Sequence, residues 1–185
     1  MEFISEDELL SSLERVVLQP LCSQGWPGYG NVLFLSFGRK VFPAIIPGIG
    51  LKKQKRPGHQ LQTNMSYWWV QNELLVGQIG KDIGQSELGR ESALAAIEAL
   101  IGEKGLSVEI FDGFALKIQF SSHLSLCIKP YQSDVDATSS IWGVRGTDGF
   151  VSFVTHSGLM YRVHKNEPSS NYLDALRVKV REMGS

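Results

Sequence analysis

The sequence has few of the features that mark secreted, membrane-bound or metal-binding proteins. Its two cysteines, Cys22 and Cys127, are too few for a disulfide framework or a cysteine metal site. No apolar run approaches the length of a membrane span. Residues 1–8 are acidic and lack the basic start and apolar core of a signal peptide. These absences predict a cytoplasmic protein without a membrane partner.

The chain also has little net charge. Its 18 Lys and Arg residues almost balance its 19 Asp and Glu residues, which gives a formal charge of −1. A nucleic-acid-binding protein usually presents a basic face, and the overall charge requires none here. We therefore expect no direct contact with nucleic acid. The hydrophobic share of 43% is that of an ordinary globular domain.

Short motifs of common enzymes are missing as well. The glycines of residues 25–30 are not followed by the Gly-Lys-Ser/Thr of a phosphate-binding loop, and there is no Gly-x-Ser-x-Gly nucleophile turn. None of the four histidines has the spacing of a metal site. We therefore predict a protein that is not an enzyme, with no catalytic residue, metal or cofactor.

What the sequence does contain is a pattern that occurs twice. Each copy has an apolar helical stretch, then a β-rich stretch, then a strand with tryptophan. The copies comprise residues 13–17, 31–37 and 66–70, and residues 97–101, 115–120 and 140–144. Ser5 and Glu8 form a capping-box pattern ahead of the first helix. An amphipathic helix must cover one face of a sheet, so each copy is expected to be an α+β unit.

The predicted fold class is therefore α+β, with two related helix-plus-antiparallel-meander units that arise by internal duplication and share a core. The first unit spans residues 1–80 and includes a long loop at 43–64. The second unit spans residues 86–164. Residues 165–185 form a linker and a short C-terminal helix. A repeated unit without a repeated catalytic motif favours a binding scaffold.

Three groups of residues are candidates for contact with a protein partner. Loop aromatic residues are favoured interface anchors, long loops often carry function, and a short acidic loop can steer a basic partner. For the charged groups, an ordinary solvated loop is the alternative. The candidates are Trp26 and Tyr29, the basic run Lys52, Lys53, Lys55 and Arg56, and the acidic pair Asp134 and Asp136.

The second copy resembles bacterial immunity-like proteins that are found beside polymorphic toxins. The resemblance lies in segment 106–110, an Asp-Gly turn at Asp112, the alternating strand 116–120, the segment 124–126 and the Trp strand 141–144. It implies a protein that binds and neutralises a cognate toxin in the cytoplasm, as in contact-dependent growth inhibition, with a secreted nuclease-type domain as the expected toxin. The chain lacks the acidic bias common in inhibitors of nucleases.

Two other functions stay open at this stage. One is an enzyme that acts on nucleic acid or a small molecule, with His123 and His156 as an acid–base pair beside Asp134 and Asp136. It would require these side chains to converge in one pocket. The other is an adaptor module of a larger assembly.

Overall fold

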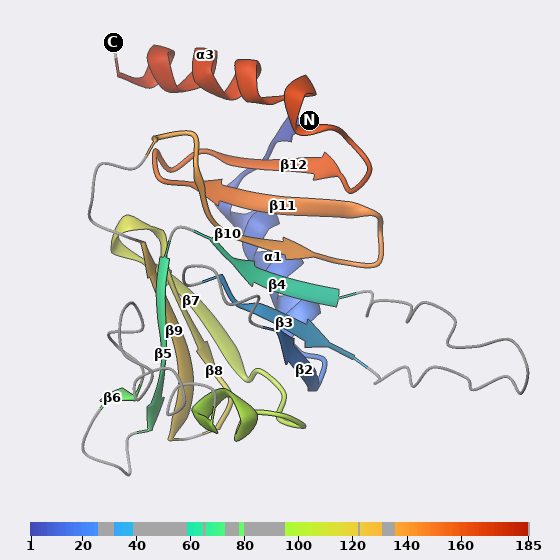
Figure 1. The fold of residues 1–185 in the computed structure, drawn as a ribbon, viewed down its shortest axis with the longest axis vertical. Coiled ribbons are helices and arrows are strands. Elements are labelled where there is room, and N and C mark those ends of the chain that lie inside the picture. The colour runs from blue at the N-terminus through green and yellow to red at the C-terminus, as the bar shows by residue number, and fades with distance from the viewer. Residues whose placement is uncertain are drawn as a thin grey trace, which may run out of the picture.

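The computed structural model describes residues 1–25, 32–38, 59–64, 66–72, 78–79, 95–121, 123–130 and 136–184 (Figure 1). Strands make up most of this part of the chain, and the helices are short. The elements are β1 (Glu2–Phe3), α1 (Glu6–Val17), β2 (Leu21–Gly25), β3 (Phe34–Phe37), β4 (His59–Thr63), β5 (Ser66–Asn72), β6 (Gln78–Ile79), β7 (Ser107–Phe111), β8 (Ala115–Gln119), β9 (Leu124–Pro130), β10 (Ser140–Arg145), β11 (Phe150–Thr155), β12 (Met160–His164) and α3 (Leu173–Met183). Residues 95–98 are also helical.

The strands form two antiparallel sheets. The large sheet has the order β1-β12-β11-β10-β4-β3-β2, and the small sheet has the order β6-β5-β9-β8-β7. The chain passes from the large sheet to the small one between β4 and β5, and it returns between β9 and β10. Each sheet therefore takes strands from residues 1–80 and from residues 86–164.

The expected fold class of two helix-plus-meander α+β units is wrong. The meander β2-β3-β4 does not pair with β5, the strand that follows it; β4 pairs with β10, and β5 pairs with β9. The result is a mostly antiparallel β structure of two sheets with small helices. Local patterns indicate where strands begin and end, but the choice of neighbour depends on contacts between faces and edges far apart in sequence.

Helix α1 follows the sequence expectation closely. Ser5 accepts a hydrogen bond from the Glu8 amide, and Glu8 accepts one from the Ser5 amide at 2.9 Å, so the capping box is present. Its buried residues are Leu9, Leu13, Val16 and Val17. They pack into a core shared by the inner faces of both sheets. This anchoring holds the exposed side of α1 at the surface in one orientation.

Two tryptophans occupy the centre of this core, as expected from their strands. Trp68 on β5 and Trp142 on β10 are both 0% exposed. They belong to different sheets. The Trp142 indole nitrogen donates a hydrogen bond of 2.9 Å to the carbonyl oxygen of Phe114, which precedes β8. This bond connects the large sheet to the small one.

The C-terminal helix α3 packs on the opposite face of the large sheet from α1, at the β12 side (Figure 1). In this helix Leu176 is fully buried, with Tyr172, Leu173 and Val180 packed around it. The helix covers a small cluster separate from the main core. The candidate site described below lies on the other face of the large sheet, beside α1.

Candidate functional site

Most residues that the sequence singled out lie outside the described residues. These are Trp26, Tyr29, Lys52, Lys53, Lys55, Arg56 and Asp134. Asp136 is described and exposed, in the turn before β10. Its carboxylate accepts hydrogen bonds from the amide and the hydroxyl of Thr138 at 2.9 and 2.8 Å. These bonds hold the pKa of Asp136 below its ordinary value, so the group is charged and accessible at neutral pH.

The two histidines of the enzyme alternative do not come together. His123 immediately precedes β9, at the end of that strand away from β10. The His156 amide donates to the carbonyl oxygen of Ser139, just before β10. The start of β10 lies near the Pro130 end of β9, because Asn64 bonds Ser140 and the nearby Ser66 pairs with Pro130. His156 is therefore near the Pro130 end of β9, whereas His123 is at its Leu124 end. The length of β9, roughly 20 Å, separates the two histidines, so they do not form an acid–base pair.

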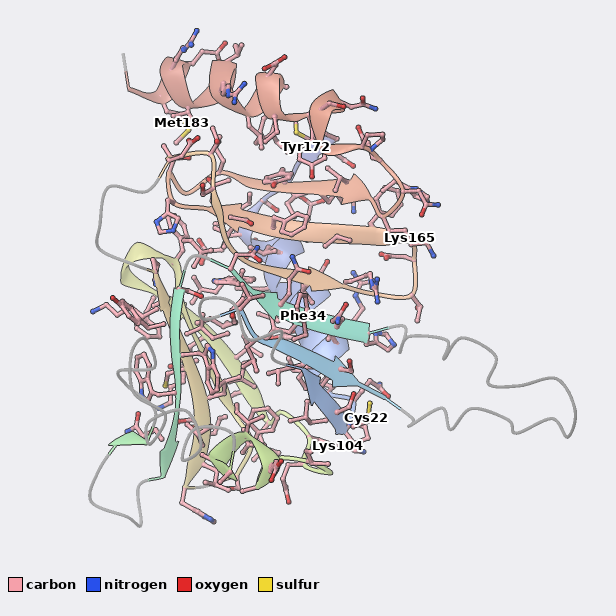
Figure 2. All side chains as sticks on the ribbon, in the orientation of Figure 1. Cys22, Phe34, Lys104, Lys165, Tyr172 and Met183 are labelled. Carbon is pink, nitrogen blue, oxygen red and sulfur yellow. The ribbon has the colours of Figure 1, made fainter. Side chains whose placement is uncertain are left out.

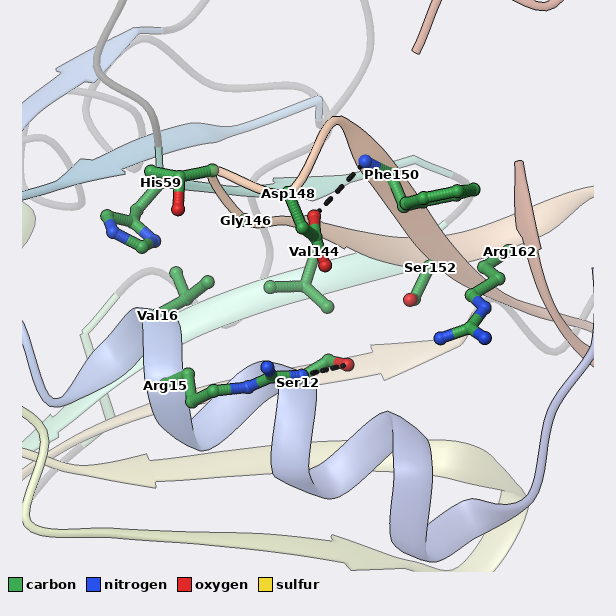
Figure 3. A pocket seen from close by; sticks show the side chains of 11 residues that line it. Ser12, Arg15, Val16, His59, Val144, Gly146, Asp148, Phe150, Ser152 and Arg162 are labelled. Carbon is green, nitrogen blue, oxygen red and sulfur yellow. Dashed lines mark hydrogen bonds between the residues drawn. The ribbon is translucent and has the colours of Figure 1, made fainter. Parts of the chain in front are cut away.

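A small cavity lies beside α1, on the face of the large sheet that α1 covers (Figure 3). Its volume is about 70 Å³. The walls come from α1, from strands β4, β10, β11 and β12, and from the β10–β11 turn. Arg15 reaches the cavity from α1 and Arg162 reaches it from β12, with Asp148 of the β10–β11 turn between those elements. His59 of β4 contributes a buried Nδ1 atom that has no hydrogen-bond partner among the described residues.

Arg162 is held rigidly at one side of the cavity. Its Nε atom lies 2.8 Å from a carboxylate oxygen of Glu2, and this hydrogen bond raises the pKa of the guanidinium group. The guanidinium carbon lies 5.6 Å from the centre of the Phe150 ring, within the range of a cation–π contact. Phe150 is 39% exposed. Arginine and aromatic side chains of this kind are typical anchors of protein interfaces.

Arg15 lies at the other side of the cavity from Arg162 and has no carboxylate partner among the described residues. It bonds along its own helix, with Nε donating to the Ser11 carbonyl at 3.1 Å and Nη2 donating to the Ser12 hydroxyl at 3.3 Å. Its side chain therefore lies along the surface of α1, where it is exposed.

Most charged residues of α1 are acidic, and Arg15 is its one basic residue. Glu6, Asp7, Glu8 and Glu14 are all exposed, and none of them forms an ion pair with a described residue. The hydrogen bonds from the Ser5 amide and hydroxyl lower the pKa of Glu8. We call these four residues the acidic surface. Glu8 is engaged by the Ser5 cap, so Glu6, Asp7 and Glu14 are the members of this surface that are available to a partner.

Sequence reasoning missed this surface, although the signal was present. Residues 6–8 were interpreted as a helix start and as evidence against a signal peptide. The buried stripe of α1 centres on Leu9 and Leu13, so helical spacing places Asp7 and Glu14 together on the outer side. The local acidity was hidden by an overall charge that is close to zero.

The described part of the chain shows no group of three His, Cys, Asp or Glu side chains that could hold a metal ion. Nor does it contain a helix with the length and apolar character needed to cross a lipid bilayer. Comparisons with models of protein families, with curated proteins and with solved structures find no match to this chain. The site itself is therefore the basis for a functional proposal.

Proposed function

We propose that the protein is a cytoplasmic immunity protein that binds and neutralises a cognate nuclease-type toxin domain through the α1 face. The observation that carries this proposal is the acidic surface, unpaired among the described residues, beside the platform of Phe150 and Arg162. The resemblance of segments 106–126 and 141–144 to immunity-like proteins supports it. A protein of this kind needs a rigid surface and no turnover.

The charge of the surface favours a basic partner. A nuclease must hold phosphate groups, and lysine and arginine do this. An acidic surface competes for these cations and steers the toxin during encounter, which raises the association rate. Phe150 with Arg162 then supplies an anchor of the type that dominates binding energy. An interface of standard size, about 800 Å² per partner, would cover the cations that the nuclease needs for its substrate.

The first experiment asks whether the protein protects cells and binds a toxin. The toxin domain encoded by the adjacent open reading frame is expressed with and without this protein, and growth and copurification are measured. Rescue of growth together with a stable complex is expected. A toxic domain that neither binds this protein nor is neutralised by it would end the proposal.

The second experiment tests the α1 face. In a double variant, Asp7→Lys with Glu14→Lys, the association rate with an inactive toxin domain should fall at least tenfold at low salt, as is typical when electrostatic steering is lost. The difference should shrink in high salt because exposed charges are screened. Asp174→Lys on α3 is the matched control and should associate like the parent. A double variant that associates at the parental rate at low salt would place the interface elsewhere.

A further inference from the structure

Three large aliphatic side chains are exposed near the C-terminal end of α1. Leu18 is 53% exposed, Ile101 is 41% exposed and Leu106 is 64% exposed. They come from two segments that are distant in sequence, the end of α1 and the loop 101–106 that precedes β7. We call these three residues the apolar patch. Exposed apolar residues on segments that lie side by side are candidates for a binding surface.

Backbone contacts hold the two segments together. The Gly105 amide donates to the Val17 carbonyl at 2.8 Å, and the Gly102 amide donates to the Leu21 carbonyl at 2.7 Å. A Cβ atom on Gly105 would lie 3.0 Å from the Val17 side chain, so the absence of a side chain permits this approach. In Figure 2, Cys22 and Lys104 mark the same end of the molecule, and Pro20 forms a β-bridge with Lys104. The patch is thus presented on a fixed backbone.

The patch continues the acidic surface along α1. Glu14 lies four residues before Leu18, so the two side chains are neighbours on one helical face. A partner that pairs with Asp7 and Glu14 through lysine or arginine would reach Leu18 next. Charge complementarity therefore selects a partner whose basic surface carries an apolar side chain at its border.

We propose that the apolar patch is a second anchor, in addition to Phe150 and Arg162, that holds the toxin domain after charge has brought it to α1, by taking an apolar side chain that borders the toxin's basic surface. This inference rests on the proposed function and assigns the association rate and the dissociation rate of the complex to different residues. The acidic surface sets the association rate, and the apolar patch sets the dissociation rate. Exposed charges act mainly on association, whereas most changes in affinity at a packed contact appear in dissociation.

The test measures both rates by surface plasmon resonance with the inactive toxin domain as the probe. Leu18→Gln keeps a good helix former, and Leu106→Ser removes the most exposed member of the patch. Each should raise the dissociation rate about tenfold, which is the effect expected when burial of a leucine side chain is lost. The association rate should change less than about twofold. Val178→Ser is the matched control, since Val178 is 54% exposed on α3.

The outcomes separate this inference from the proposed function. If the parent forms no complex, both are wrong. If the parent binds and both patch variants dissociate at the parental rate, only the apolar patch is wrong. Sedimentation velocity of the protein alone tests whether a second copy of the protein covers the apolar patch. A dimer that Leu106→Ser converts to a monomer would overturn the inference. Melting temperatures equal to that of the parent establish that each variant is folded.

Discussion

Gly143 on β10 supports a sharp prediction about how α3 is held on the large sheet. The Phe153 ring of β11 lies over this glycine: an added Cβ would be 2.4 Å from one ring carbon and 2.6 Å from the next. Phe153 stacks on Tyr161 with ring centres 5.4 Å apart, and Tyr161 contacts Tyr172 at 5.9 Å, beside the start of α3. A methyl group at Gly143 therefore pushes on a chain of aromatic rings that ends at α3.

The expected cost of Gly143→Ala follows from these distances. Carbon atoms pack best at about 3.5 Å, so the ring must move by about 1 Å. Over-packing of this kind costs about 1–3 kcal/mol. For a chain of this size, a loss of about 2 kcal/mol lowers the melting temperature by about 4–8 °C.

Circular dichroism melting and hydrogen exchange together test this reasoning. Gly143→Ala should melt earlier, and the amides of α3 should exchange faster relative to those of α1. Adding Phe153→Leu should recover part of the loss because it removes the ring that clashes. Gly184→Ala, where a Cβ finds only contacts of 3.8 Å or more, should melt like the parent. A Gly143→Ala variant as stable as the parent would refute the reasoning.

Three further predictions concern the scaffold that positions the site. Ser5→Ala removes the cap of α1 and should cost about 1 kcal/mol, measured by urea unfolding at pH 7. Because the pKa of Glu8 is lowered in the folded protein, its contribution is present above the unfolded value of 4.5 and is lost as the pH falls through the lower folded value. Glu8→Gln should therefore destabilise at pH 7, and its effect should shrink as the pH falls and Glu8 becomes protonated in the folded protein; an effect that does not change with pH would contradict this. Trp142→Phe leaves the Phe114 carbonyl without its indole donor and should cost about 1–3 kcal/mol in the same assay.

Sequence patterns predicted several local features because such features depend on neighbours in the chain, but the expected loop at 43–64 contains strand β4 at His59–Thr63. The capping box at Ser5 and Glu8 and the apolar stretch of α1 are confirmed, and a short helix is present near the C-terminus as expected. Strands were also expected at 66–70 and 140–144, where β5 and β10 lie. Each of these signals is contained within a few turns or a single strand.

The arrangement of the sheets could not be obtained in the same way. The likeness of the two tryptophan strands suggested equivalent positions in two separate units. Instead β5 pairs with β9 in the small sheet, and β10 lies between β4 and β11 in the large one. An apolar strand face fits either sheet, and only long-range packing decides between them.

For the candidate site, sequence reasoning favoured charged runs and aromatic residues in loops. Asp136 is the one member of that set in the described part of the chain, and it is exposed, as a partner contact requires. The acidic surface was missed because its importance depends on which side of α1 is buried. Arg162 and Phe150 lie on different strands, and only the pairing of β11 with β12 brings them together.

Hydrogen exchange of the protein in complex with the inactive toxin domain tests the central claim most directly. We expect the backbone amides of α1 and of residues 101–106 to exchange more slowly in the complex than in the protein alone, and those of α3 to exchange at an unchanged rate. Protection confined to α3, or no protection anywhere, would contradict it.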